Sequence, residues 1–159
     1  MGDVFVQVSF DVPNFAKHLS AQDPVALVMR AHLYAEAALI RLIESTFVRK
    51  EAFDTVTRLQ FLSKVDLAIA LGKVDPRGRG GYAALNKLRN RFAHDLNTQL
   101  VEKDELDFYN ALSDKQREFA NASRKPKLPL MGRLRCDLVG LIMHLEAMAN
   151  KAPRGFTQP

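Results

Sequence analysis

Apolar side chains recur through most of the chain at the spacing of an amphipathic helix. The longest such segment, residues 25–48, contains neither glycine nor proline, and it follows Asp23 and Pro24, two residue types that favour the start of a helix. The same spacing predicts further helices over residues 55–71, 82–96, 104–121 and 130–151. Five helices without alternating strands predict an all-α fold in the form of a five-helix bundle.

The N-terminal residues show a different pattern. Apolar and polar side chains alternate over residues 4–10, which is typical of a short strand, and Pro13 ends the alternation. A single strand needs a partner, so this segment either pairs with a second chain or remains a loosely held arm. We therefore expect three parts, which are a short N-terminal extended segment over residues 1–22, a helical domain over 23–152 and a frayed tail over 153–159.

Composition narrows the class of protein. The chain has 159 residues, with 23 Lys and Arg against 18 Asp and Glu, so a net charge of +5 permits a polyanionic partner. It contains no apolar run of about 20 residues and no secretory signal, so we expect no membrane span. Cys136 is the single cysteine, which favours a cytoplasmic protein without disulfides. Histidines and carboxylates lack metal-ligand spacing, so we expect no metal and no other cofactor.

The most informative stretch covers residues 85–95, with the sequence LNKLRNRFAHD. On a helical wheel its leucines and phenylalanine form one face, and most of its polar residues form the other. Asn90 and His94 lie four residues apart and are therefore neighbours on the polar face. Arg89 lies at the border, where its guanidinium can reach around the helix. Together these three residues offer an imidazole that moves protons near neutral pH, a cation for phosphate and an orienting amide.

These residue types match the needs of metal-free RNA cleavage. A 2′-hydroxyl that attacks its own phosphate needs a proton acceptor, a proton donor for the leaving 5′-oxygen and a cation for the charge on the phosphate oxygens. One imidazole fills only one of the two proton roles at a time. The chemistry therefore favours a homodimer that brings two copies of His94 into one cleft.

The same residues resemble a known motif. Residues 89–94, RNRFAH, fit the RNxxxH form of the R-x4-6-H motif of HEPN (higher eukaryote and prokaryote nucleotide-binding) domains, which are all-helical and usually dimeric. The sequence SKVDLAIALG at residues 63–72, followed by a loop and then LNKLRNRFAH, resembles the HEPN-related families that include mannitol-operon repressor-like proteins. The resemblance covers about residues 25–100.

The resemblance implies two kinds of function. Many HEPN proteins are metal-independent endoribonucleases of toxin-antitoxin, phage-defence or RNA-processing systems, and their motif residues correspond here to Arg89, Asn90 and His94. An antitoxin or operon partner is then expected as well. Other members, including the mannitol-repressor-like group, are transcriptional regulators or interaction modules without catalysis. HEPN toxins that pair with nucleotidyltransferase antitoxins carry a tyrosine two residues after the histidine, whereas this chain has Leu96, so the resemblance does not extend to that pairing.

Other polar residues extend the hypothesis or offer alternatives to it. We expect the cleft around the motif to be supported by Glu36, His32, Arg91 and Lys87, with Glu36 accepting a hydrogen bond from Arg89 or His94; a solvated helix face explains them equally well. An RNA-binding rim is predicted from basic residues in the loops over residues 72–81 and 123–135, namely Arg77, Arg79, Arg124, Lys125 and Lys127. A structural role for the motif, and sequence-specific DNA binding, are the remaining alternatives, although no helix-turn-helix is evident.

Overall fold

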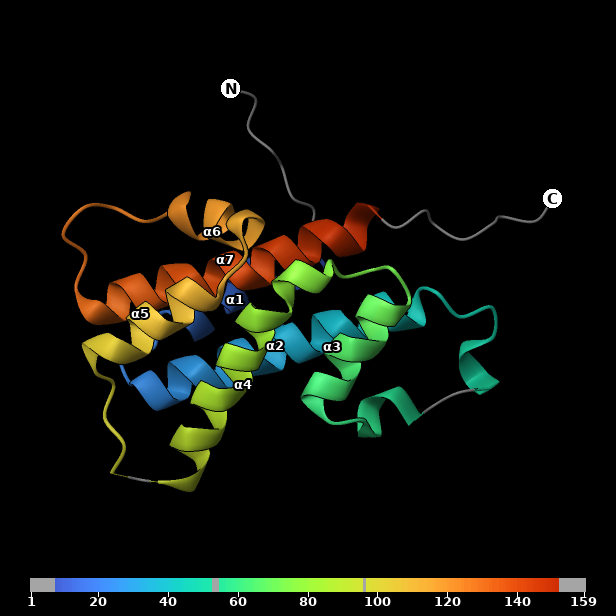
Figure 1. Cartoon of the computed structure of the whole chain (residues 1–159), viewed down its shortest axis with the longest axis horizontal. Helices are drawn as coiled ribbons and strands as arrows, with labels where there is room; N and C mark the ends of the chain where they lie inside the picture. The colour runs from blue at the N-terminus through green and yellow to red at the C-terminus, as the bar shows by residue number, and fades with distance from the viewer. Residues whose placement is uncertain (1–7, 53–54, 96, 152–159) are drawn as a thin grey trace.

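The computed structural model describes residues 8–52, 55–95 and 97–151, and helices joined by loops make up most of these ranges (Figure 1). Within them lie seven α-helices: α1 Val12–Leu19, α2 Pro24–Glu44, α3 Phe61–Ala70, α4 Arg79–His94, α5 Glu102–Ala111, α6 Asp114–Asn121 and α7 Leu130–Lys151. Three short 3-10 helices join them: η1 Lys50–Ala52, η2 Thr55–Arg58 and η3 Pro76–Gly78. No strand occurs among the described residues, so the prediction of an all-α protein is confirmed for them.

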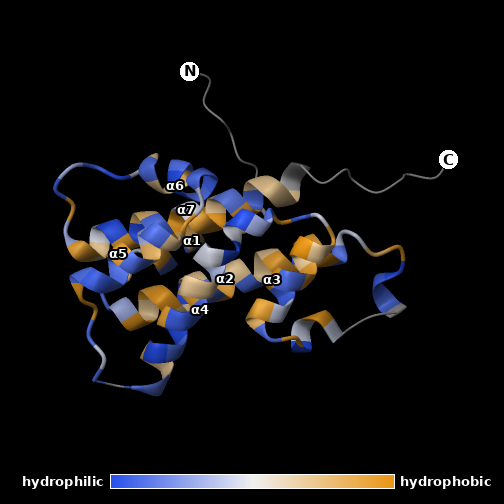
Figure 2. Ribbon diagram, in the orientation of Figure 1, coloured by the Kyte–Doolittle hydropathy of each residue, from blue (hydrophilic) through white to orange (hydrophobic). Residues whose placement is uncertain are grey.

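The two long helices, α2 and α7, form the centre of the bundle. They pack against each other along the molecule, and α4 crosses over α2 while contacting α5 (Figure 1). Fully buried alanines at positions 31, 35 and 38 of α2 let its neighbours approach closely. The ribbon is mainly hydrophobic over α2 and α3 and mainly hydrophilic over α6 (Figure 2). The core therefore lies between α2, α7 and the helices that cover them.

The start of α2 forms as the sequence predicts. Asp23 has an extended backbone, and its carboxylate accepts hydrogen bonds from the backbone N–H groups of Val25 (3.3 Å) and Ala26 (3.0 Å). Pro24 follows as the first helical residue. This cap satisfies two of the backbone donors that a helix start leaves without partners.

The glycines at the start of α4 pack closely against α5 and α6 instead of lying in one long loop. We predicted a loop over residues 72–81, but α4 begins at Arg79 and includes Gly80 and Gly81. A Cβ on Gly80 would lie 2.8 Å from the backbone oxygen of Ala111, and one on Gly81 would lie 2.7 Å from Oε1 of Gln116. Glycine is required at position 80, because the start of α4 lies against the backbone at the end of α5.

Two predicted elements differ in the structure and raise the helix count above five. The predicted helix over residues 104–121 is divided at Ser113, whose hydroxyl accepts from the N–H of Gln116 (3.3 Å) while Gln116 Oε1 accepts from the Ser113 N–H (2.9 Å). This reciprocal capping begins a new helix, α6. Residues assigned to the extended segment include α1, which Asp11 caps. The predicted strand lies mostly outside the described residues, as does the tail, and residues 8–10 have no regular structure.

Candidate functional site

The three motif residues lie on the second half of α4. His94 is exposed in the last turn, at the end of α4 that projects from the bundle (Figure 1). Arg89 and Asn90 are half-buried, and Nη1 of Arg89 donates to Oδ1 of Asn90 at 3.0 Å. Asn90 therefore contacts the guanidinium of Arg89, whereas the imidazole of His94 is open to solvent.

Arg89 is bonded differently from comparable arginines. The five other half-buried arginines of the described chain each donate to a carboxylate or a backbone carbonyl, and they are Arg41, Arg117, Arg124, Arg133 and Arg135. Nε of Arg89 is buried without a hydrogen-bond partner among the described residues. A buried donor without a partner is costly, and such groups are often associated with a ligand, an ion or catalysis.

His32 lies beside this arginine, as the sequence predicted, but it is buried rather than open to a cleft. Its ring is 6% exposed and lies 4.2 Å, centroid to centroid, from the ring of Phe61. Burial lowers its pKa, and the nearby charges of Arg89 and Lys64 act in the same direction, while Glu36 and a hydrogen bond with Asn86 oppose them. The imidazole is therefore neutral at physiological pH.

Glu36 bonds to a residue that the sequence analysis missed. The buried ammonium of Lys64 on α3 donates to Oε1 of Glu36 at 2.7 Å and to the backbone oxygens of Leu59 at 2.6 Å and Thr57 at 3.3 Å. Among the described contacts, none joins Glu36 to Arg89 or His94, so the expected hydrogen bond is absent. Lys64 stands three residues after Phe61, on the apolar side of its helix. A lysine at such a position was the sequence signal that could have predicted a buried ion pair.

Lys87 and Arg91 lie on another side of α4, away from Arg89. Both line a groove of about 750 Å³ between α4 and α5. Arg91 makes two hydrogen bonds of 2.6 Å to the carboxylate of Asp104. The helical wheel already places Lys87 and Arg91 away from Arg89, because each is two residues and thus about 200° from Arg89 around the helix. Arg91 therefore joins α4 to α5, and Lys87 lines the same groove; neither lies beside Arg89.

The predicted rim residues fall in two places. Before and at the start of α4, Arg77 pairs with Asp75 and Arg79 with Asp66, each with its shortest contact at 2.6 Å. Between α6 and α7, Arg124 pairs with Glu105 and, at 3.1 Å, with Asp137. The remaining two, Lys125 and Lys127, are exposed beside a hollow of about 440 Å³.

Neither a metal site nor a known relative assigns a function to these residues. Within residues 8–52, 55–95 and 97–151, no group of three or more histidine, cysteine, aspartate or glutamate side chains is arranged to hold a metal ion. No helix of that part of the chain combines the length and apolar character needed to cross a membrane. Comparison with protein-family models, curated proteins and solved structures found no match.

Proposed function

We propose that the chain is a HEPN-like, metal-independent endoribonuclease that cuts RNA by attack of a 2′-hydroxyl. Arg89, Asn90 and His94 form half of the active site in this proposal, and a second copy of the chain supplies the other half. The observation that carries it is the state of Arg89, a half-buried guanidinium whose Nε lacks a hydrogen-bond partner among the described residues and which lies five residues before an exposed histidine on the same helix.

The surroundings of Arg89 favour a phosphate as its missing partner. Lys64 and Arg89 place two positive charges near His32, and burial keeps this imidazole neutral, so it adds no third charge. Glu36 bonds with Lys64 rather than neutralising the guanidinium. A cation that the fold leaves without a carboxylate is suited to charge that develops on phosphate oxygens in a transition state.

The proposed reaction uses the two copies of His94 in different protonation states. A neutral His94 accepts the proton of the 2′-hydroxyl as the 2′-oxygen bonds to phosphorus. The protonated His94 of the second copy donates its proton to the 5′-oxygen as the phosphorus–oxygen bond breaks. Arg89 stabilises the negative charge on the phosphate oxygens between these events. The products are a 2′,3′-cyclic phosphate and a 5′-hydroxyl, and no water or metal enters this step.

Cleavage of an end-labelled RNA in excess chelator tests this function. The wild-type protein should release fragments with 2′,3′-cyclic phosphate ends, and His94→Ala should lower the rate by at least about 100-fold because acid–base catalysis contributes that much. Arg89→Lys should also be impaired, because an ammonium does not match the planar two-point contacts of a guanidinium. Lys115→Ala, an exposed cation of α6 that pairs only with Glu118 among the described residues, is the control.

Two outcomes would overturn the proposal. Cleavage that requires Mg²⁺, or that persists unchanged in His94→Ala, would assign the activity to another site or to a contaminant. A folded homodimer that leaves RNA intact would instead favour the non-catalytic regulator of the mannitol-repressor-like kind.

A further inference from the structure

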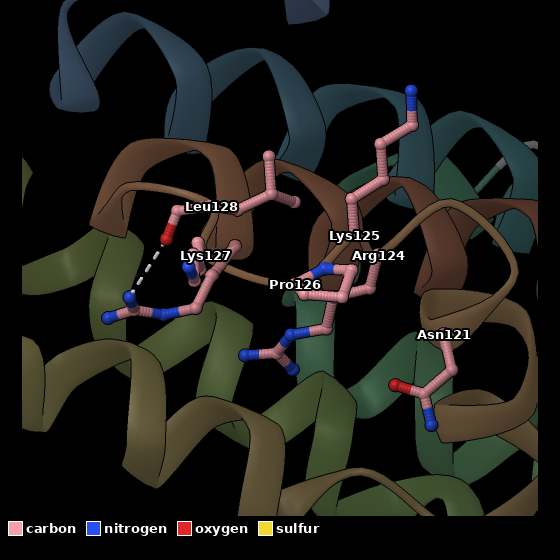
Figure 3. Close-up of a pocket in the computed structure, with 7 residues that line it drawn as sticks. Asn121, Arg124, Lys125, Pro126, Lys127 and Leu128 are labelled. Atoms are coloured by element: carbon pink, nitrogen blue, oxygen red, sulfur yellow. Dashed lines mark hydrogen bonds between the residues drawn. The ribbon is translucent and has the colours of Figure 1, made fainter.

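The loop between α6 and α7, residues 122–129, forms a basic surface outside the proposed active site; we call it the basic loop. Arg124, Lys125 and Lys127 of this loop and Arg133 of α7 line the hollow of about 440 Å³ (Figure 3). Asn121, at the end of α6, completes its polar lining. Four cations around one hollow repel one another, so their positions need an explanation.

Only part of this positive charge is balanced by the fold. Arg124 and Arg133 bond to Glu102, Glu105 and Asp137. Burial and a hydrogen bond with Glu105 raise the pKa of Asp137 well above the usual carboxyl range, so this side chain is largely protonated at neutral pH. Lys125 and Lys127 are exposed and have no ion pair among the described residues. Four cations thus face two carboxylates, which leaves an excess of two positive charges.

The backbone of the basic loop is held in one conformation. Lys127 has a φ of 63°, a left-handed conformation that a lysine adopts only at a cost. The guanidinium of Arg133 donates to the backbone oxygen of Leu128 at 3.1 Å, the contact drawn in Figure 3. Pro126 and Pro129 further restrict the chain. The lysines are therefore presented by a preformed turn rather than by a flexible connection.

The arrangement fits an extended phosphodiester chain with bases better than a single phosphate. Lys125 extends away from the guanidinium of Arg124 in Figure 3, so the charges spread along the loop instead of converging on one point. The guanidinium of Arg124 lies 4.4 Å from the ring centroid of Tyr109, and Tyr109 donates to Oδ1 of Asn121 at 3.1 Å. An arginine plane supported in this way is a surface on which an unpaired base can stack.

We propose that the basic loop binds single-stranded RNA outside the cleavage site, with Lys125 and Lys127 contacting successive phosphates and Arg124 stacking on a base. The choice of RNA as ligand rests on the proposed function. Binding at this loop needs neither His94 nor Arg89, so the two proposals fail separately.

The test measures binding of a labelled single-stranded RNA whose 2′-oxygens are methylated, so that attack by a 2′-hydroxyl cannot occur. Anisotropy titrations over a series of salt concentrations compare the wild-type protein with Lys125→Ala/Lys127→Ala. Loss of two phosphate contacts should reduce the slope of log affinity against log salt by about 1.4 and weaken binding on the order of tenfold at 0.1 M salt. The matched control is Lys17→Ala/Lys50→Ala, which removes two exposed lysines of α1 and η1.

The control should retain the wild-type slope. Equal weakening in both double variants would mean diffuse attraction to net charge, and no weakening in either would exclude the loop; each result overturns the proposal. A poly-glutamate peptide of equal charge should compete poorly, because it has no base to stack. Competition as strong as that of unlabelled RNA would assign the surface to an acidic protein instead. Loop-dependent binding without any cleavage would retain this site and refute only the nuclease.

Discussion

Two clusters of charged side chains in this bundle are bonded in opposite ways. The α5–α7 network consists of Glu102, Glu105, Arg124, Arg133 and Asp137, and both of its arginines contact carboxylates. The α4 cluster consists of His32, Glu36, Lys64, Arg89 and Asn90; here Lys64 bonds to the carboxylate of Glu36, and among the described residues Arg89 donates only to the amide oxygen of Asn90. The ion pairs of the α5–α7 network therefore serve the packing of the bundle. The α4 cluster, by contrast, leaves the cation of Arg89 available for a ligand.

The largest expected effect is on the network. Arg124→Ala would leave Glu105 paired with Arg133 alone and would remove the cation that bonds to Asp137, and breaking a buried ion pair costs about 3–5 kcal/mol of unfolding free energy. Urea unfolding of the purified variant measures this directly. A loss below about 1 kcal/mol would show that the network is not what holds α5 against α7.

Lys64 should behave as a structural residue although it lies in the α4 cluster. Lys64→Met keeps the length of the side chain but removes the ammonium that donates to Glu36 and to the backbone oxygens of Thr57 and Leu59. We expect a loss of about 1.5–3 kcal/mol in urea unfolding, the usual net contribution of hydrogen bonds made by a charged group. If Lys64→Met were neutral, the distinction between paired and available cations within this cluster would be lost.

The two clusters should also respond to pH with opposite signs. Burial lowers the pKa of His32, so its contribution to stability is complete above pH about 6.5 and is lost as the pH falls below that value. Burial raises the pKa of Asp137, so stability falls as the pH rises from the ordinary carboxyl pKa near 4 towards the raised value. Each slope is at most about 1.4 kcal/mol per pH unit.

Unfolding free energies measured from pH 5 to pH 8 separate these contributions. Asp137→Asn, which imitates the protonated acid, should gain stability relative to wild type as the pH rises. His32→Asn should no longer lose stability as the pH falls below about 6.5, and it should keep the loss of stability with rising pH that Asp137 causes. A wild-type curve that is unchanged in both variants would contradict the assignment of these two groups.

The smallest expected effect on stability is at Arg89. Arg89→Ala removes a side chain that, within the described part of the chain, donates only to Asn90, so we expect a loss of unfolding free energy below about 1 kcal/mol and a near-complete loss of RNA cleavage. Thermal unfolding and the cleavage assay are performed on the same preparation. Destabilisation as large as that of Arg124→Ala would make the motif structural.

Local sequence signals predicted many of the helices, but they could not predict ion pairs between residues that are far apart in the sequence. Asp23 and the helix that it begins follow from spacing and capping, which depend on neighbouring residues only. Exposure of His94 on the polar side of α4 agrees with the helical wheel. The ion pair of Glu36 with Lys64 joins residues 28 positions apart, so only the packing of α3 on α2 creates it. The pairing of Arg124 with Asp137 likewise arises only from packing. From the sequence, Arg124 was therefore interpreted as an unpaired cation of an RNA-binding rim.

Mixing wild-type protein with His94→Ala tests the composite active site most directly. If cleavage needs His94 from both copies of a homodimer, an equimolar, fully exchanged mixture should show roughly one quarter of the wild-type activity at the same total protein, because only a quarter of the dimers carry two wild-type chains. An activity of one half would mean that each chain acts alone. That result, or wild-type protein that leaves RNA intact, would contradict the account.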